Sequence, residues 1–427
     1  MKKVLIIGHL WPYNPGGSKR VFGLAKYLPE FGWEPIILTG IPREEPDPEF
    51  RVISTSSPNA IVEFKKILHL NPNKGIQEQV GIPPMVIHRQ GSITTKIMKL
   101  FEEVITYPDV ESGWKPFAVN AVRNLFTLEN ISALISVWPI TAHLIAKELK
   151  CKFKIPWIAD FPDLWSETYA YSYGPVRKWF DRNLEKKTLR LADTLTTSSW
   201  PQTEVLKKMH GRDDIYTITI GFDPSKINDP SACLTKEFTI TYTGIFYGRY
   251  RNPSKFFQAL SELLRSNLID PYDMLVRFYG HREKAVELEI EKFKLSHVIK
   301  QYGTVAWEEC LWKQWESQVL LQLNWECKEE KGAYSGKIAE YLAARRPVLC
   351  VGGFGKDVME ELIRDTRIGE YCPSVEETKK ALLNYYKEYK ITGKVSFTGD
   401  VLKIDKYSCR EMARRFAGLL DSVALRS

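Results

Sequence analysis

One helix start in the second half of the chain combines residues that can bind phosphate with a carboxylate at helical spacing. Ser335, Gly336 and Lys337 open the expected helix, and Glu340 follows about one turn later. Backbone amides at a helix N-terminus hold phosphate, and a carboxylate one turn along can accept two hydrogen bonds from a ribose diol. Each residue alone is ordinary on a surface helix, but the combination predicts a nucleotide site.

A glycine turn earlier in the same half carries several cations. Gly244 ends an expected strand, Tyr247, Arg249 and Arg251 follow it, and Lys255 comes a little further on. Guanidinium groups suit bidentate contact with a diphosphate. We interpret this turn as a diphosphate contact, with a solvated basic turn as the alternative.

Two glycines in the first half lie between the first expected strand and the first expected helix. Without Cβ atoms, Gly16 and Gly17 let backbone amides approach an anion at the helix N-terminus closely. The loop lacks the second and third glycines of the dinucleotide fingerprint. An anion cradle and a merely tight turn both stay open.

Three further polar residues follow strand ends in the first half. His143 opens a helix after the strand expected at 133–137, while Asp160 and Asp163 come at the end of the strand expected at 156–160. Ligands of open α/β sheets bind beyond the carboxyl ends of strands, so we expect these side chains to face a ligand. A structural histidine and a helix-capping aspartate are the alternatives. The chain has no Asp-x-Asp pair, so a divalent metal is not indicated.

Short apolar runs alternate with helical patterns along the chain, which indicates βαβ units with parallel strands buried on both faces. We expect these strands at 3–8, 35–39, 133–137, 156–160 and 194–197, and then at 238–243, 275–279, 299–302, 319–324 and 347–351. The simplest account is an α/β protein with two doubly wound domains, 1–222 and 223–405, and an amphipathic closing helix in 406–427.

Residues 61–100 interrupt this alternation with basic residues interleaved among apolar ones. Such an insertion can lie on an anionic bilayer surface. A helix pair with a solvated basic face is the alternative.

Composition sets wide limits on the function. The chain has 427 residues, 44% of them hydrophobic, which favours two globular domains. Its net charge of +8 favours anionic ligands without requiring them. The seven cysteines form no close pairs, so we expect reduced thiols in the cytoplasm. No signal peptide or membrane-spanning stretch is evident, and any membrane contact is expected to be peripheral.

Taken in order, these segments resemble glycosyltransferase family 4 over most of the chain. The resemblance implies a GT-B fold, in which two Rossmann-like domains face a cleft, the second binds a nucleotide-sugar donor, and the closing helix crosses back to the first. The segments that carry it are Pro-Gly-Gly-Ser at 15–18, Pro-x-x-x-His-Leu at 139–144, Trp-Ile-Ala-Asp-Phe-x-Asp-Leu-Trp at 157–165, Tyr-Thr-Gly at 242–244 and Gly-Lys-Ile-x-Glu-Tyr-Leu-Ala at 336–343.

The resemblance also implies roles for individual residues. His143 would contact the transferred sugar, Glu340 would bind the ribose, and Arg249 with Arg251 or Lys255 would neutralise the leaving diphosphate. The residues expected to act in catalysis are His143, Asp160, Asp163 and Arg249. Those expected to bind the donor are Gly16, Gly17, Gly244, Tyr247, Arg251, Lys255, Gly280, Val305, Ser335, Gly336, Lys337 and Glu340.

The chain departs from the family pattern at two places. Gly332 stands where the E-x7-E motif has its first glutamate, so contact with the donor sugar there would fall to backbone amides. The usual spacing of the arginine and lysine is not reproduced, which leaves the second cation open.

The implied reaction moves a sugar from a UDP- or GDP-sugar to a glycan or lipid-linked acceptor, with retention at the anomeric carbon, as in polysaccharide biosynthesis. The nucleotide sugar is a co-substrate, and we expect no metal, no other cofactor and no nucleic-acid partner. A nucleotide-sugar epimerase and a non-catalytic subunit that binds sugar nucleotides are the alternatives. The expected location is the cytoplasm, with peripheral contact with an anionic membrane at its inner face left open.

Overall fold

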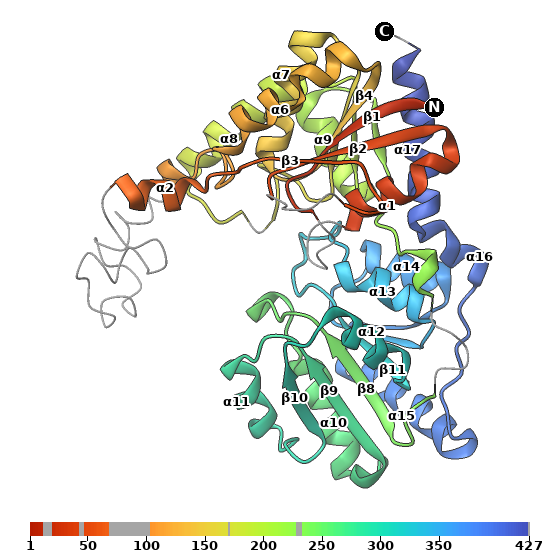
Figure 1. The fold of residues 1–427 in the computed structure, drawn as a ribbon. Helices are drawn as coiled ribbons and strands as arrows, with labels where there is room; N and C mark the ends of the chain where they lie inside the picture. The colour runs from red at the N-terminus through yellow and green to blue at the C-terminus, as the bar shows by residue number, and fades with distance from the viewer. Residues whose placement is uncertain (12–18, 42–46, 68–102, 170, 228–232, 426–427) are drawn as a thin grey trace. The chain divides into compact units, whose positions relative to one another are not determined.

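The computed structural model describes residues 1–11, 19–41, 47–67, 103–169, 171–227 and 233–425. The chain forms two compact units, one of Met1–Ile218 with Ala413–Ser427 and one of Thr219–Met412 (Figure 1). Each unit is built on a parallel sheet.

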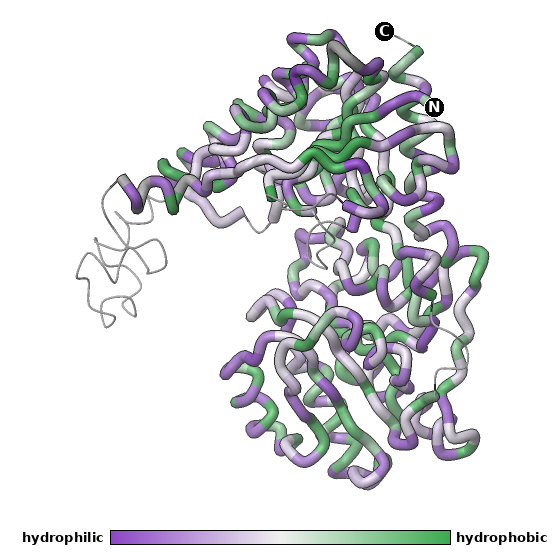
Figure 2. Tube along the Cα trace, viewed as in Figure 1, coloured by the Kyte–Doolittle hydropathy of each residue, from purple (hydrophilic) through white to green (hydrophobic). Residues whose placement is uncertain are grey.

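The sheet of the first unit has seven strands within the described residues, in the order β3-β2-β1-β4-β5-β6-β7. Helices cover both faces, which is why its central strands are continuous apolar runs. Figure 2 shows hydrophobic residues gathered along these strands. The strands are β1 (Lys2–Ile7), β2 (Trp33–Thr39), β3 (Val52–Ser54), β4 (Ile131–Ser136), β5 (Trp157–Phe161), β6 (Thr194–Thr197) and β7 (Ile215–Thr217).

The described helices of this unit lie between successive strands, except for α17, which follows the second unit. Strands β1 to β3 are added toward one edge of the sheet and β4 to β7 toward the other, so right-handed crossovers place α1 and α7 on opposite faces. Figure 1 shows α6, α7 and α8 side by side. The helices are α1 (Lys19–Tyr27), α2 (Ala60–Ile67), α6 (Trp114–Leu128), α7 (Ile140–Phe153), α8 (Pro175–Leu189), α9 (Trp200–His210) and α17 (Cys409–Ala424).

Helix α17 returns to the first unit after the chain has passed through the second. Its buried residues recur at helical spacing and include Phe416, whose ring centroid lies 5.2 Å from the Arg20 guanidinium of α1. Asp421 accepts a hydrogen bond of 2.9 Å from Lys2 at the start of β1. The amphipathic closing helix expected from the sequence therefore packs on the first unit.

The sheet of the second unit has six strands in the part of the chain that is described, in the order β10-β9-β8-β11-β12-β13. The order in which strands are added to the sheet reverses between β8 and β11, and at such a switch point an open sheet leaves room for ligand beyond its carboxyl edge. The strands are β8 (Phe238–Thr243), β9 (Met274–Tyr279), β10 (Ile299–Gly303), β11 (Val319–Leu323), β12 (Val348–Val351) and β13 (Gly369–Cys372).

The helices of the second unit divide between the two faces of its sheet. Helix α10 packs with α15, and α12 packs with α13. The helices are α10 (Ser254–Arg265), α11 (Lys284–Lys292), α12 (Trp307–Trp315), α13 (Gly336–Ala344), α14 (Val358–Thr366), α15 (Val375–Thr392) and α16 (Val401–Ile404).

All ten strands expected from the sequence occur, with ends displaced by at most two residues. Three strands escaped prediction, namely β3, β7 and β13, and each lies at the edge of its sheet. Edge strands are short and need no apolar run on both faces, so their sequences lack the signal of a buried strand.

Some sequence expectations concern residues outside this description. Gly16 and Gly17 belong to the segment 12–18, and the basic insertion 61–100 is described only through α2, to Ile67. Within the described ranges, no helix is both long enough and apolar enough to cross a bilayer.

Candidate functional site

The carboxyl ends of β8 and β9 meet at two glycines of the second unit, Gly244 and Gly280. The Gly244 N–H donates to the Tyr279 carbonyl at 2.7 Å, and φ is +124° at Gly244 and +147° at Gly280. A Cβ on Gly280 would lie 2.1 Å from the Gly244 carbonyl oxygen, and a Cβ on Gly244 would lie 2.9 Å from Lys337 Cε. Only glycine fits both positions, so backbone and lysine side chain approach each other closely here.

Polar groups that can bind an anion gather at the N-terminus of α13, next to these glycines. Ser335 is the N-cap residue, yet its side chain makes no capping bond, and its buried Oγ has no hydrogen-bond partner among the described residues. Lys337 Nζ lies 3.7 Å from the centroid of the Tyr242 ring. A hydroxyl, an ammonium group and the first N–H groups of α13 thus lie within one helical turn, where the helix dipole favours negative charge.

Glu340 lies one turn further along α13 and is held by α12. Gln314 Nε2 donates to Glu340 Oε2 at 2.9 Å and to Thr243 Oγ1 at 3.0 Å. Trp307 Nε1 donates to Glu340 Oε1 at 3.4 Å. The carboxylate is half-buried and already oriented, which lowers the entropic cost of using it to bind a diol.

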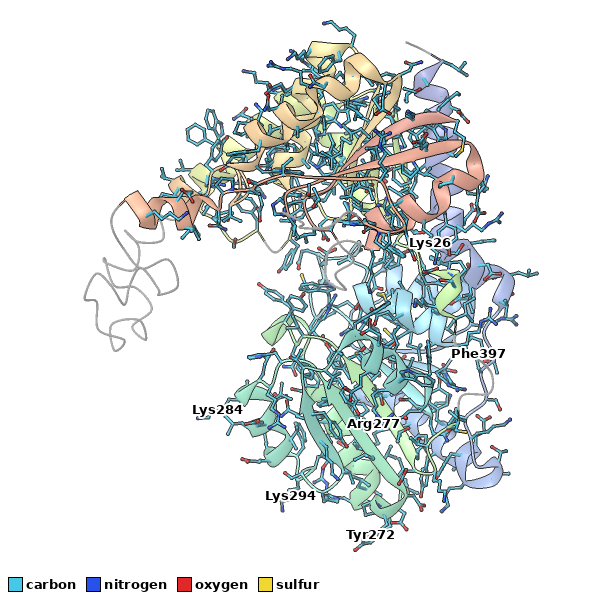
Figure 3. The ribbon with its side chains drawn as sticks, in the orientation of Figure 1. Lys26, Tyr272, Arg277, Lys284, Lys294 and Phe397 are labelled. Carbon is cyan, nitrogen blue, oxygen red and sulfur yellow. The ribbon has the colours of Figure 1, made fainter. Side chains whose placement is uncertain are left out.

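A buried arginine fixes the end of α12. Arg277 of β9, labelled in Figure 3, is 5% exposed. It donates to Thr241 Oγ1 at 3.1 Å and to Ser317 Oγ at 2.9 Å. It also pairs with Glu316, so its charge is compensated where it is buried. These contacts fix the end of α12 against β8 and β9. They therefore also help to hold Gln314 and Trp307 of α12, which donate to the Glu340 carboxylate.

Two cations follow β8 and have partners on the loop after β11. The Arg251 guanidinium is 7% exposed and lies 4.9 Å from the ring centroids of both Tyr247 and Trp325. Lys255 Nζ lies 2.9 Å from Glu326 Oε1. Aromatic faces stabilise a guanidinium in a place shielded from water without neutralising its charge. Arg251 is therefore a fixed positive charge at the carboxyl edge of the sheet.

For the two remaining site residues expected in this unit, Val305 and Arg249, the structure gives the position in the chain but no side-chain contact. Val305 lies in the loop between β10 and α12, near the end of β10 where the Gly280 N–H donates to the Gly303 carbonyl at 2.9 Å. Arg249 belongs to the turn after β8, but its side chain lies outside the described structure.

In the first unit, His143 is fully buried rather than exposed at the strand end. It is the fourth residue of α7, and its ring stacks on Phe161 with centroids 4.3 Å apart. Ser136 Oγ lies 2.7 Å from His143 Nδ1 and accepts a 2.7 Å hydrogen bond from Trp157 Nε1. The tautomer that gives the Ser136 hydroxyl hydrogen an acceptor has a bare Nδ1 and carries its proton on Nε2.

This environment fixes the charge state of the histidine. Burial lowers the pKa of His143 from 6.5 to about 3, so the ring is neutral near pH 7. Its Nε2 has no hydrogen-bond partner within the described chain. His143 is thus a neutral N–H donor in an apolar setting, and a buried donor of this kind is unusual unless a ligand or water completes it.

The Asp160 carboxylate is buried and hydrogen-bonded to residues of the same unit. It is 0% exposed, accepts from Arg20 Nη2 at 2.7 Å and Nε at 2.5 Å, and accepts from Thr196 Oγ1 at 2.6 Å. These contacts join β5, β6 and α1, which makes Asp160 a positioning residue in this geometry. Asp163, two residues beyond β5, is exposed.

The sequence did not single out two acids, Asp109 at the start of α7 and Glu111 near it in the chain. Asp109 accepts from the Thr141 N–H at 2.7 Å and from Thr141 Oγ1 at 2.6 Å, so it caps the helix that carries His143. Burial and the nearby Asp109 charge raise the pKa of Glu111 to about 7. The segment from 107 to 113 gave no motif that could have signalled this arrangement, because the contact with α7 spans about thirty residues of chain.

Solved structures provide the comparison with known proteins. Sucrose-phosphate synthase from Thermosynechococcus elongatus matches with a TM-score of 0.64 at 14% identity, over 100% of this chain and 100% of that one. A variant of S. aureus TarM matches with a TM-score of 0.58 at 9% identity, over 99% and 100%. A putative UDP-N-acetylglucosamine 2-epimerase from Listeria monocytogenes matches with a TM-score of 0.53 at 13% identity, over 100% and 98%. A scan against protein-family models and a search of curated proteins gave no match.

The chain has the GT-B fold. This confirms the fold class expected from the sequence, with two Rossmann-like sheets and a closing helix that returns to the first unit. The GT-B proteins it matches include both transferases and an epimerase-like protein, so the fold by itself does not choose between these chemistries.

Proposed function

We propose that this GT-B protein is a glycosyltransferase of the family 4 type. It moves a sugar from a UDP- or GDP-linked donor to a glycan or lipid-linked acceptor, retains the configuration of the anomeric carbon, and needs no metal. The observation that carries the proposal is the start of α13, where an unsatisfied buried hydroxyl, a lysine and a pre-oriented carboxylate occur together.

The α13 start matches the parts of a nucleoside diphosphate. Phosphate oxygens would accept from Ser335 Oγ and the first N–H groups of the helix, with Lys337 as the nearby positive charge. The ribose hydroxyls would donate to Glu340, about one turn away. Gly244 and Gly280 let the ends of β8 and β9 and the Lys337 side chain approach one another closely, because a side chain at either position would collide with its neighbours.

Charge stabilisation is the chemical task of this site. Breaking the bond between the anomeric carbon and the donor oxygen leaves positive charge on the sugar and negative charge on the departing diphosphate. Arg251, held between two aromatic rings, and Lys255, anchored by Glu326, are cations positioned for the negative charge. Preorganised charges act strongly in such a site because they need not reorient during the reaction.

The first unit holds a hydrogen-bond donor of a different kind. His143 Nε2–H is neutral and buried, which suits a hydrogen bond to a sugar hydroxyl better than proton transfer near pH 7. The S. aureus TarM variant was solved in complex with UDP, and this supports a uridine nucleotide as the first donor to try.

A panel of UDP- and GDP-sugars separates this proposal from its rivals. A transferase releases nucleoside diphosphate in an acceptor-dependent way, an epimerase returns an isomerised donor, and a binding subunit does neither. Detection of an isomerised sugar nucleotide, with no diphosphate release under any acceptor, would replace the proposal by the epimerase. Product from an active pairing, analysed by NMR for its anomeric configuration, tests retention.

A further inference from the structure

Helix α8 of the first unit buries charged residues and exposes apolar ones. The face that packs against the unit carries Arg177, Asp181 and Glu185, which are 5%, 1% and 0% exposed. The face that points away carries Trp179 and Phe180, which are 63% and 51% exposed, preceded by Val176 at 69%. A surface helix of a soluble domain normally shows the opposite pattern. The exposed residues Val176, Trp179 and Phe180 are called the α8 stripe below.

The buried charges of α8 are used within the unit. Arg177 pairs with Asp181 at 3.1 Å and donates to the Pro108 carbonyl at 2.8 Å. Glu185 accepts from the Ser166 N–H at 3.0 Å and from its hydroxyl. These contacts fix the rotation of the helix, so the outward direction of the apolar stripe is imposed by the fold and is not an accident of a loosely held helix.

The charged residues that remain exposed on α8 and at its C-cap are all basic. They are Arg182, Lys186, Lys187 and Arg190, while both acids of the helix are buried. Glu167, on the preceding loop, lies 3.5 Å from both Lys178 and Arg182 and offsets part of this charge. The outward face of α8 nevertheless keeps an excess of positive charge around its apolar stripe.

Aromatic residues widen the exposed apolar surface. The Trp179 and Phe180 rings pack edge to face with centroids 4.9 Å apart. The Tyr107 and Tyr173 rings, partly exposed, flank the Arg177 guanidinium at 4.6 and 4.7 Å. Tryptophan and tyrosine side chains are suited to the boundary between water and hydrocarbon because each combines an apolar ring with a polar group.

We propose that α8 docks the protein onto an anionic lipid bilayer, with the α8 stripe at the level of the headgroups and the basic residues beside lipid phosphates. Charge complementarity argues for this occupant: four separated cations and a narrow apolar stripe on one convex helix are satisfied together by a flat anionic surface. A protein partner would have to supply acids on both sides of an apolar groove. The proposal does not depend on the enzymatic activity.

Sedimentation of the full-length protein with phosphatidylcholine vesicles, with and without phosphatidylglycerol, tests this docking. We expect binding that requires phosphatidylglycerol and that weakens by about tenfold or more in the double variant Trp179→Ser with Phe180→Ser. The triple variant Arg182→Gln, Lys186→Gln and Lys187→Gln should weaken binding to a similar degree and reduce its dependence on salt.

Matched variants on the second unit control for general effects. Trp312→Ser removes an indole that is 59% exposed on α12, and Lys284→Gln with Lys292→Gln and Lys300→Gln removes the same charge from exposed positions. Both controls should bind vesicles like the original protein. Since all altered side chains are exposed, thermal melts should show that every variant is folded.

Three outcomes overturn the proposal. The first is vesicle binding that is unchanged in the α8 variants, and the second is equal weakening in the controls on the second unit. The third is a protein that ignores vesicles but forms an oligomer that Trp179→Ser abolishes, because α8 would then be an interface between copies of this chain.

Discussion

Replacing His143 by asparagine removes one hydrogen-bond donor while keeping the contact on the other side of the ring. The asparagine carbonyl oxygen takes the place of Nδ1 and can still accept from Ser136 Oγ, which lies 2.7 Å from that atom. The N–H at the position of Nε2 is lost. We expect His143→Asn to retain donor binding and lose most of the transfer rate, because the proposed nucleotide contacts all belong to the second unit.

The size of the effect follows from burial. An ordinary neutral hydrogen bond contributes about 1 kcal/mol, whereas a donor aimed at developing charge in a water-excluded site contributes roughly 3 kcal/mol. His143 is 0% exposed and neutral, which places it between these cases. The turnover number should therefore fall by about 10- to 100-fold.

His143→Gln is the matched control, since a glutamine amide can reach the place of Nε2 and restore an N–H donor. Steady-state kinetics with an active donor and acceptor should show partial recovery of turnover in this variant. A contact made mainly in the transition state lowers turnover and catalytic efficiency together. Normal turnover of His143→Asn at saturating substrates would refute the catalytic role, and equal losses in both variants would leave only a packing role.

The lowered pKa of His143 also predicts how the stability of the folded protein depends on pH, independently of any activity. Burial lowers the folded-state pKa of His143 to about 3, while the unfolded chain takes up the proton near pH 6.5. The unfolded state then binds more protons as pH falls below 6.5, so the original protein loses stability there, by about 2 kcal/mol at pH 5 from this group. Denaturant titrations at pH 7.5 and 5 should show a smaller acid loss in His143→Asn.

Three further predictions concern other parts of the molecule. Glu340→Ala should weaken UDP or GDP binding by about 1.5–3 kcal/mol in calorimetry, since a charged acceptor for the ribose is lost, while Glu291→Ala on α11 should not; equal affinities in the two variants would exclude the ribose role. Turnover should survive EDTA because Lys337 and Arg251 supply the positive charge, and an activity restored only by manganese or magnesium would contradict this. Glu111, whose pKa is raised to about 7, keeps a proton that the unfolded chain releases near 4.5, so stability should fall from pH 4.5 to 7. Denaturation curves of Glu111→Gln should lack this component, and an unchanged pH profile would count against it.

The order of strands along the chain could be predicted because most buried strands have a recognisable run of apolar residues. Strand β12 and the last four residues of β1 are apolar and buried, as a parallel strand covered on both faces has to be. The edge strand β13 contains Glu370 within four residues and lacks this signal. Glycines at strand ends, such as Gly244, were visible for a similar reason, since positive φ and close approach select glycine locally.

The sequence by itself thus determined which elements form and which residue types stand at their carboxyl ends. Only the tertiary structure decided what each side chain does there. Asp160 lies near the end of β5 and His143 in the first turn of the helix after β4, yet the carboxylate of Asp160 pairs with Arg20 while the histidine keeps a buried N–H that meets no partner in the described chain. The contacts that make this difference join residues up to 140 positions apart, and local periodicity carries no information about them. The reversed polarity of α8 is hidden for the same reason, because its charges become buried only through partners on other segments.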